Sequence, residues 1–240
     1  MDLPPDHVPI EPPADDRLTV ERLLAEVRNE FVSIEHGFLY TAKELLLRPG
    51  LTLAAVWRGD RARYTGPFRF FMLSFTFYAL VWISTGAMDR FWDAQRVALA
   101  AQAAAVGKSV TPDIGAVYLR HPLVSEFGTV LAMWLATWIW FWRARVNAAE
   151  RAAMPLYWYG LVNLVQVPLF WVGFTSHLLL YSQLLGLVGL IFVAWATYTA
   201  FEPRRWWNAL RGMAWWVTGA LMWGMALGFA AGVRQGFNAG

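Results

Sequence analysis

Residues 178–201 read LLLYSQLLGLVGLIFVAWATYTAF and contain no charged side chain. A helix needs about 20 apolar residues to cross the roughly 30 Å hydrocarbon core of a bilayer, and this stretch is long enough. Similar stretches occur at 70–88, 122–142, 154–174 and 213–233. The sequence therefore predicts an all-α membrane protein with five transmembrane helices.

The composition agrees with this prediction. The chain is 58% hydrophobic and only 15% charged, and most of its charges lie outside the five stretches. Because basic residues gather at the ends of the stretches, we expect contacts with anionic lipid headgroups and none with nucleic acid. The absence of cysteine excludes disulfides and thiolate metal sites.

The N-terminal third has a different pattern. Residues 1–16 are acidic and proline-rich, which predicts a disordered tail. Residues 17–66 predict short amphipathic helices that lie in the membrane interface, with a small cytoplasmic subdomain as the alternative. Residues 67–240 would then form the five-span domain, with a surface helix in the loop 89–121. The apolar stripe of the first amphipathic helix comprises Val20, Leu23, Leu24, Val27, Phe31 and Ile34.

The distribution of Lys and Arg predicts the orientation. With the N-terminus inside, fifteen basic residues lie on the cytoplasmic side and five outside. This bias predicts a cytoplasmic N-terminus and an outer C-terminus, because cytoplasmic loops carry an excess of positive charge. Tryptophans also cluster toward the predicted cytoplasmic ends of the spans, where their amphipathic rings are favoured.

Two motifs resemble a known family. The segment GFLYTAKELLLRPG at 37–50 and the segment WRGDRARYTGPFRFF at 57–71 are similar to an uncharacterised family of bacterial multi-span membrane proteins, catalogued only as a domain of unknown function. Small five-span proteins of the Yip1 type are a more distant likeness. The resemblance covers about residues 31–85 and implies a bacterial inner-membrane location, but no activity. Relatives often carry a histidine in the segment that leads into the third span and a cysteine ribbon upstream. Here the corresponding segment, AERAAMPLYWYG at 149–160, has no histidine, and the chain has no cysteine.

Four polar residues interrupt the predicted spans, and polar groups within a membrane raise a functional question by default. Asn163 and Gln166 are three residues apart and share a helix face. Glu126, Gln166 and Gln183 would lie in the outer half of the bilayer and could line one pocket. The alternative is that the amides bond neighbouring helices and that Glu126 reaches the outer interface.

The histidines suggest a weaker hypothesis. His121 and His177 would lie at similar depth at the outer surface, with Glu126 nearby. Two imidazoles and a carboxylate match an open zinc site, but the spacing of His121 and Glu126 does not put them on one helix face. We therefore expect interfacial histidines, no metal and no cofactor.

Arginines flank the entry to the first span and form a denser signal. They are Arg48, Arg58, Arg61, Arg63 and Arg69. Guanidinium groups match phosphate geometry, which favours binding of lipid headgroups, whereas plain topology marking is the alternative.

Small residues recur every fourth position in the fifth span, at Ala220, Gly224, Gly228 and Gly232. Such a ladder allows close approach of another helix, either from the same chain or from a second copy.

No pattern indicates an enzyme, since no nucleophile and base lie at a workable spacing. The sequence favours a structural, lipid-interacting or complex-partner role in the membrane. A small transporter or channel that uses the outer polar residues is the alternative. The inner halves of the spans are nearly all apolar or aromatic, which disfavours a polar path across the membrane.

Overall fold

The computed structural model describes residues 37–60, 63–86, 89–90, 93, 96–97, 100–101, 104–105, 122–144, 146–173 and 178–238. Seven helices and no strand occur within these residues. The expectation of an all-helical protein is therefore confirmed for the described part of the chain. The predicted tail 1–16 and the amphipathic stripe between Val20 and Ile34 lie outside it.

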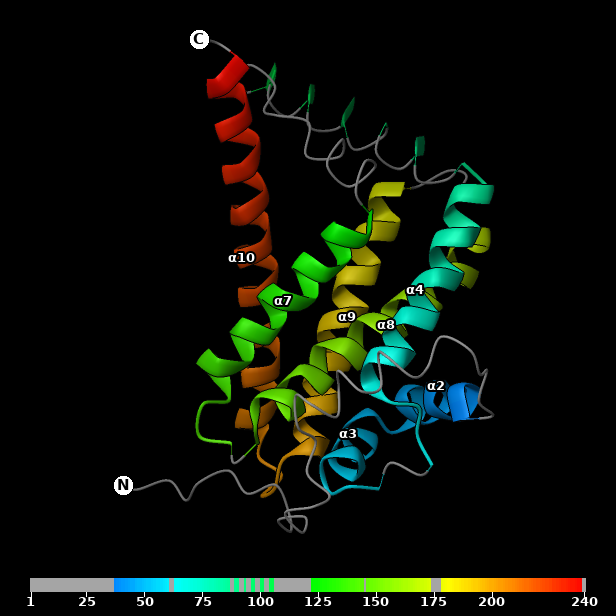
Figure 1. Ribbon diagram of the computed structural model, residues 1–240, viewed down its shortest axis with the longest axis vertical. Helices are drawn as coiled ribbons and strands as arrows, with labels where there is room; N and C mark the ends of the chain where they lie inside the picture. Colours follow the sequence, from blue (N-terminus) through cyan, green and yellow to red (C-terminus); the bar gives the residue numbers. More distant parts are fainter. Residues whose placement is uncertain are drawn as a thin grey trace.

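Two short helices precede five long ones. The short helices are α2 (Gly37–Leu47) and α3 (Pro49–Trp57), and the long helices are α4 (Pro67–Ser84), α7 (Pro122–Trp140), α8 (Ala148–Gly173), α9 (Leu178–Ala200) and α10 (Trp206–Asn238). The long helices alternate in direction, so that α2, α3 and the connections 141–147 and 201–205 lie at one end of the bundle (Figure 1). The C-terminus lies at the opposite end.

Two of these helices, Pro67–Ser84 and Leu123–Trp140, are long and apolar enough to cross a membrane. Helix α9 contains the shorter apolar helical stretch Gly186–Ala200. Helices α8 and α10 are long enough but contain polar, glycine and aromatic residues that lower their average hydropathy. Membrane association is thus weakly supported by length and composition, and five spans remain a proposal.

Local signals determine where the long helices begin and end. Helix α8 begins six residues before the expected span because Asn147 and Glu150 form a capping box. Asn147 Oδ1 accepts a hydrogen bond from the Glu150 N–H at 2.9 Å, and Glu150 Oε2 accepts one from the Asn147 N–H at 2.7 Å. Helix α4 ends four residues early because Gly86 adopts a positive φ of 60° just after it.

Helix α3 is buried, and this differs from the expected interfacial position. All of its residues except Leu51 are buried. Its sequence, PGLTLAAVW, has no charge, and Gly50 lets it approach α9 closely. A Cβ at Gly50 would collide with the backbone of α9 at Ala196 and Ala200. Helix α2 keeps the one-sided pattern, since only Thr41 and Leu45 are buried.

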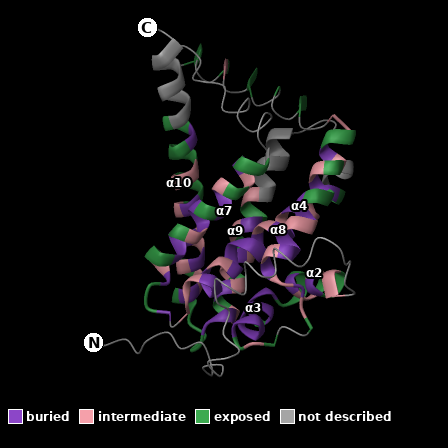
Figure 2. Ribbon diagram, viewed as in Figure 1, coloured by how far each residue is buried: buried purple, intermediate pink, exposed green. Residues whose placement is uncertain are grey.

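The packing is densest at the end of the bundle that holds α3. Helix α4 packs against α8, α10 packs against α7 and α9, and α3 packs against α9. Figure 2 shows buried residues gathered toward this end and exposed residues along the outer faces of α7 and α10. The largest fully buried side chains include Trp215, Phe70 and Phe201. This core holds the surrounding connections in place.

Candidate functional site

The end of the bundle that holds α2 and α3 carries exposed cations, and we call it the basic end (Figure 1). Asp60 and Glu202 are the exposed acids on the described segments of this end, and Glu44 is half-buried. Cations therefore outnumber acids there. The exposed basic residues are Lys43, Arg48, Arg58, Arg63, Arg143, Arg204 and Arg205.

Tryptophans accompany these cations. Trp142, Trp206 and Trp207 are exposed in or beside the connections of the basic end. The guanidinium carbon of Arg143 lies 4.9 Å from the centre of the Trp142 ring, within reach of a cation–π interaction. Exposed tryptophan beside exposed arginine is typical of the region where a protein meets lipid headgroups.

The connection between α3 and α4 is held by buried hydrogen bonds. The Tyr157 hydroxyl of α8 donates to the Thr65 carbonyl at 2.7 Å. The Thr65 N–H donates to Thr41 Oγ1 of α2 at 2.8 Å. At the end of α3, Trp57 Nε1 donates to the Glu150 carbonyl at 2.9 Å. The residues next to Arg58 and close to Arg63 are therefore bonded to two other helices, α2 and α8.

Tyr64 lies beside Arg63 in this turn. Partial burial raises the pKa of Tyr64, and the nearby Tyr40, Glu44 and Asp60 raise it further. The ring centres of Tyr40 and Tyr64 are 5.7 Å apart. The Tyr64 hydroxyl therefore stays protonated at neutral pH and can donate a hydrogen bond at the basic end.

Arg151 has a different role from the exposed arginines. Its guanidinium is buried, and it donates to the carbonyls of Thr137, Phe141 and Ala144 at 3.2, 2.7 and 3.1 Å. These carbonyls belong to the last turn of α7 and the residues after it, and each also accepts a backbone N–H. The guanidinium is therefore a second donor to each carbonyl, at a helix end where a cation is favoured. The guanidinium also lies 4.6 Å from the Trp138 ring centre. Burial lowers the pKa of Arg151, and Glu150 opposes that effect.

The five arginines predicted as headgroup ligands do not share one environment. Arg48, Arg58 and Arg63 are exposed at the basic end. Arg69 is only 6% exposed, because it lies among the buried residues of α4. It is therefore not part of a headgroup-binding surface. Arg61 lies outside the described residues.

Among the four polar residues predicted in the spans, the structure brings Glu126 of α7 close to Asn163 of α8. Glu126 Oε2, Asn163 Nδ2 and Ser125 Oγ are buried without a hydrogen-bond partner in the described protein. Gln166 is half-buried. The side chain of Gln183 lies outside the described part, so convergence of Glu126, Gln166 and Gln183 stays a prediction.

The two histidines considered for zinc, His121 and His177, lie outside the described residues. In the described part of the chain, no three His, Asp or Glu side chains gather in a way that could hold a metal ion.

The small-residue ladder of α10 faces outward. Ala220, Gly224 and Gly228 are exposed, and no heavy atom lies within 4 Å of the position that a Cβ would occupy at Gly224 or Gly228. At these two glycines no helix in the described part of the chain packs on the ladder, and a second copy stays the other prediction. The burial of Gly232 is not described.

Other glycines make the close helix contacts. Gly212 of α10 meets Thr197 of α9, and Gly219 of α10 meets Met133 of α7. Gly160 of α8 meets Phe70 of α4, and Gly128 of α7 meets Trp223 of α10. Sequence reasoning missed them because each is a single glycine opposite one large or branched side chain, with no repeat to mark it.

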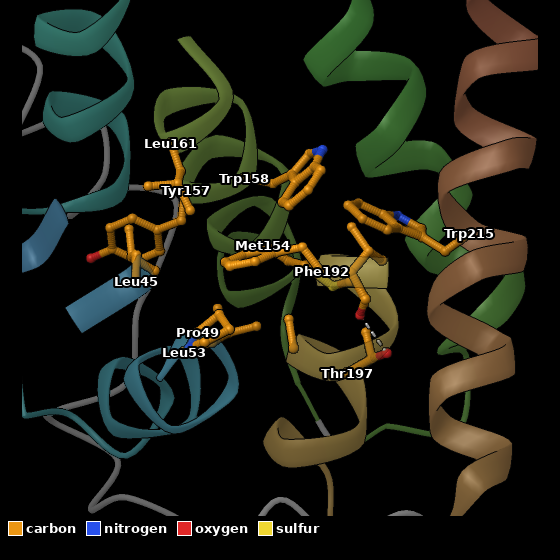
Figure 3. A pocket seen from close by; sticks show the side chains of 12 residues that line it. Leu45, Pro49, Leu53, Met154, Tyr157, Trp158, Leu161, Phe192, Thr197 and Trp215 are labelled. Carbon is orange, nitrogen blue, oxygen red and sulfur yellow. Dashed lines mark hydrogen bonds between the residues drawn. The ribbon is translucent and has the colours of Figure 1, made fainter. Parts of the chain in front are cut away.

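A small apolar cavity lies above α3, where five helices meet. Its volume is about 40 Å³, and Leu45, Leu53, Met154, Phe192 and Trp215 are among its lining residues (Figure 3). Thr197 also lines it, but its hydroxyl donates to the Val193 carbonyl at 2.8 Å, so it offers no free donor. The cavity has room for little more than a water molecule and few polar partners for one, which argues against a catalytic pocket.

Comparison with known proteins gives one finding. A family model described as "Protein of unknown function (DUF3667)" matches residues 35–79, which is less than half of the chain. The match spans α2, α3 and most of α4, together with the arginine-bearing turn. Neither a curated protein nor a solved structure matches the chain. The part that resembles this uncharacterised family thus includes α2, α3 and the start of α4 at the basic end.

Proposed function

We propose that this protein is an integral membrane protein of five transmembrane helices that binds anionic lipid headgroups at its basic end. Helix α2 would lie in the interface, with the N-terminal side cytoplasmic and the C-terminus outside. The inner membrane of a bacterium is the proposed location, in keeping with the resemblance of the two arginine-containing motifs. The role would be structural or that of a partner in a larger complex.

The observation that carries the proposal is the number of exposed large apolar side chains on the long helices α4, α7, α9 and α10. Soluble proteins rarely expose large apolar patches, because each such patch costs free energy in water. In lipid the same exposed side chains do not carry this free-energy cost. They include Leu80, Ile83, Val124, Leu131, Ile139, Leu187, Val188, Ile191, Leu221, Met225 and Phe229.

The arrangement of charge supports the orientation. The alternating helices bring the exposed arginines of three separate connections to one end, next to exposed tryptophans. A cytoplasmic basic end would obey the positive-inside bias. Since the chain has no cysteine, single cysteines can report the side of the membrane. Ala105→Cys and Asn238→Cys should be labelled from outside and Glu202→Cys only from inside, and labelling of positions 202 and 238 from the same side would disprove the five-span arrangement.

Headgroup binding is tested at the turn between α3 and α4. Replacing Arg58 and Arg63 with Gln should weaken phosphatidylglycerol binding severalfold or more, since each basic residue near an anionic surface contributes about 1 kcal/mol. Phosphatidylcholine binding should not change. Arg96→Gln is the control, because Arg96 is exposed in the loop 89–121 and pairs with Asp93 at 3.1 Å. Equal phosphatidylglycerol binding by the parent and the double variant would refute the assignment.

A small transporter or channel is a second candidate, and one observation favours it. Glu126 of α7, the Asn163 of α8 that lies close to it, and the neighbouring Ser125 have buried polar atoms without a hydrogen-bond partner among the described residues. Unpaired buried polar groups are costly, so such a cluster marks a site where water or a proton enters. If so, Glu126→Gln should abolish proton or cation flux in proteoliposomes. Absence of flux in the parent protein would rule this candidate out.

A further inference from the structure

An open apolar groove separates α8 from α9. The two helices are consecutive in the chain, yet they contact each other at few positions. The space between them has a volume of about 360 Å³, which falls within the range of roughly 300–1,000 Å³ for small-molecule sites. It lies beside the small cavity of Figure 3, because Trp158, Leu161 and Phe192 line both.

The groove is apolar and follows both helices. On α8 it runs from Trp158 to Val165, and on α9 from Phe192 to Gly186. At a rise of about 1.5 Å per residue, this is roughly 10 Å along the helix axes. Its walls offer aliphatic and aromatic carbon, with the Tyr159 hydroxyl as one polar group. An extended hydrocarbon chain fits such a shape, whereas a polar ligand would find few partners.

The floor of the groove is built by glycines. A Cβ at Gly186 would lie 3.9 Å from the nearest atom, Cη2 of Trp216, and a Cβ at Gly189 would lie 3.4 Å from Cζ2 of Trp158. Neither glycine is therefore required for helix packing, in contrast to Gly50 or Gly212. Their effect is to leave space, which a larger residue would fill without moving the backbone.

The inner mouth of the groove lies beside cations. Leu46 of α2 lines the groove, and Lys43 precedes it by one helical turn, on the same face. Arg48 follows it by two residues in the junction between α2 and α3. Both basic side chains are exposed, whereas Glu44 is half-buried. The mouth therefore offers positive charge at the level where a bilayer would place phosphate.

We propose that this groove holds one acyl chain of an anionic phospholipid, whose phosphate is bound by Lys43 and Arg48. The inference rests on the proposed function, because it requires the exposed helix faces to lie in lipid. It adds a defined site to a general attraction for anionic lipid. The occupant follows from the two ends of the site: hydrocarbon matches the walls, and a phosphate matches the cations at the mouth.

The test is to block the groove without changing its charge. The full chain in detergent is titrated with phosphatidylglycerol or phosphatidylcholine, and bound lipids are counted by native mass spectrometry. Gly186→Leu should weaken binding of the tightest phosphatidylglycerol at least tenfold. Gly224→Leu is the matched control, because it makes the same change at a glycine of α10 with nothing within 4 Å. Val188→Trp, from an exposed groove position, is a second blocking variant in case Gly186→Leu does not fold.

The charge of the mouth is tested separately. Replacing both Lys43 and Arg48 with Gln should remove the preference for phosphatidylglycerol over phosphatidylcholine at this site, while lipid bound elsewhere stays unchanged. Unaltered tight binding in both blocking variants would overturn the groove proposal. If the effect of Arg58 and Arg63 on lipid binding then persists, the proposed function still stands. A parent protein without any preference for phosphatidylglycerol would overturn both.

Discussion

The basic end and the far half of α10 both contain glycines on apolar helices, yet the two regions have opposite environments. At the basic end, Gly50 and Gly212 meet α9 so closely that a Cβ has no room. In the far half of α10, Gly224 and Gly228 meet nothing within 4 Å. The regular spacing of the second group predicted packing more strongly than the isolated glycines did. The side chain opposite a glycine, not its repeat, decides whether the glycine is a contact.

Two arginines close together in the chain likewise have different environments. Arg143 and Arg151 lie in one short segment and contribute equally to a count of basic residues. In the structure Arg143 is exposed, whereas Arg151 is buried and donates to three carbonyl groups. Only one of them is free to contact a headgroup. Charge counts therefore predict which end of the bundle is basic, but not which residues can bind there.

The largest effect is expected for Gly50→Leu. The new side chain would collide with backbone atoms of α9, which cannot move aside as a flexible side chain can. Such overpacking should lower the free energy of unfolding by about 3 kcal/mol or more. Thermal unfolding in detergent measures the loss, with Gly224→Leu as the control. Equal melting of the two variants would mean that α3 does not pack against α9 as described.

An intermediate effect is expected for Arg151→Met. Methionine retains much of the buried volume but removes the charged donor to the carbonyls of Thr137, Phe141 and Ala144, which keep only their backbone N–H donors. Stability should fall by about 2 kcal/mol, the usual contribution of hydrogen bonds to a charged group. The exposed neighbour offers the matched change, Arg143→Met, which should alter stability by less than about 0.5 kcal/mol. If the two substitutions cost the same, Arg151 does not cap α7.

The smallest effect is expected for Gly228→Leu. Because its position on α10 is open, leucine should leave the monomer as stable as before, or stabilise it by up to about 1 kcal/mol through its better helix propensity. Met225→Leu, at an exposed position of the same helix, is the control. Size-exclusion chromatography with light scattering reports any association. Loss of a dimer in Gly228→Leu alone would show that a second copy packs on the ladder.

Much of the helical framework could be predicted from the sequence. The apolar stretch 122–142 corresponds to α7, and 178–201 corresponds to α9. The predicted ends of the helices are less accurate than their existence. Helix α8 begins at a capping box before the expected span, and α10 extends beyond both ends of its expected span. Helix formation depends on local runs and caps, and those are visible in a single sequence.

The candidate site was only partly predictable. Exposed Arg48, Arg58 and Arg63 lie at the predicted basic end, but the burial of Arg69 was not visible in the sequence. The groove between α8 and α9 had no signal at all, because it arises where two consecutive helices fail to pack together. A resemblance to an uncharacterised family could point to residues 35–79 as a unit, but not to what that unit packs against.

The sequence by itself determined the helices, their apolar surfaces and the concentration of basic residues in particular connections. These properties follow from residue type and spacing along the chain. The tertiary structure decided that α3 is enclosed, that Arg151 caps α7, that the ladder of α10 is open and that a groove lies at Gly186. Each of these depends on which side chain of a distant helix lies opposite, because burial and packing are relations between segments that no local pattern encodes.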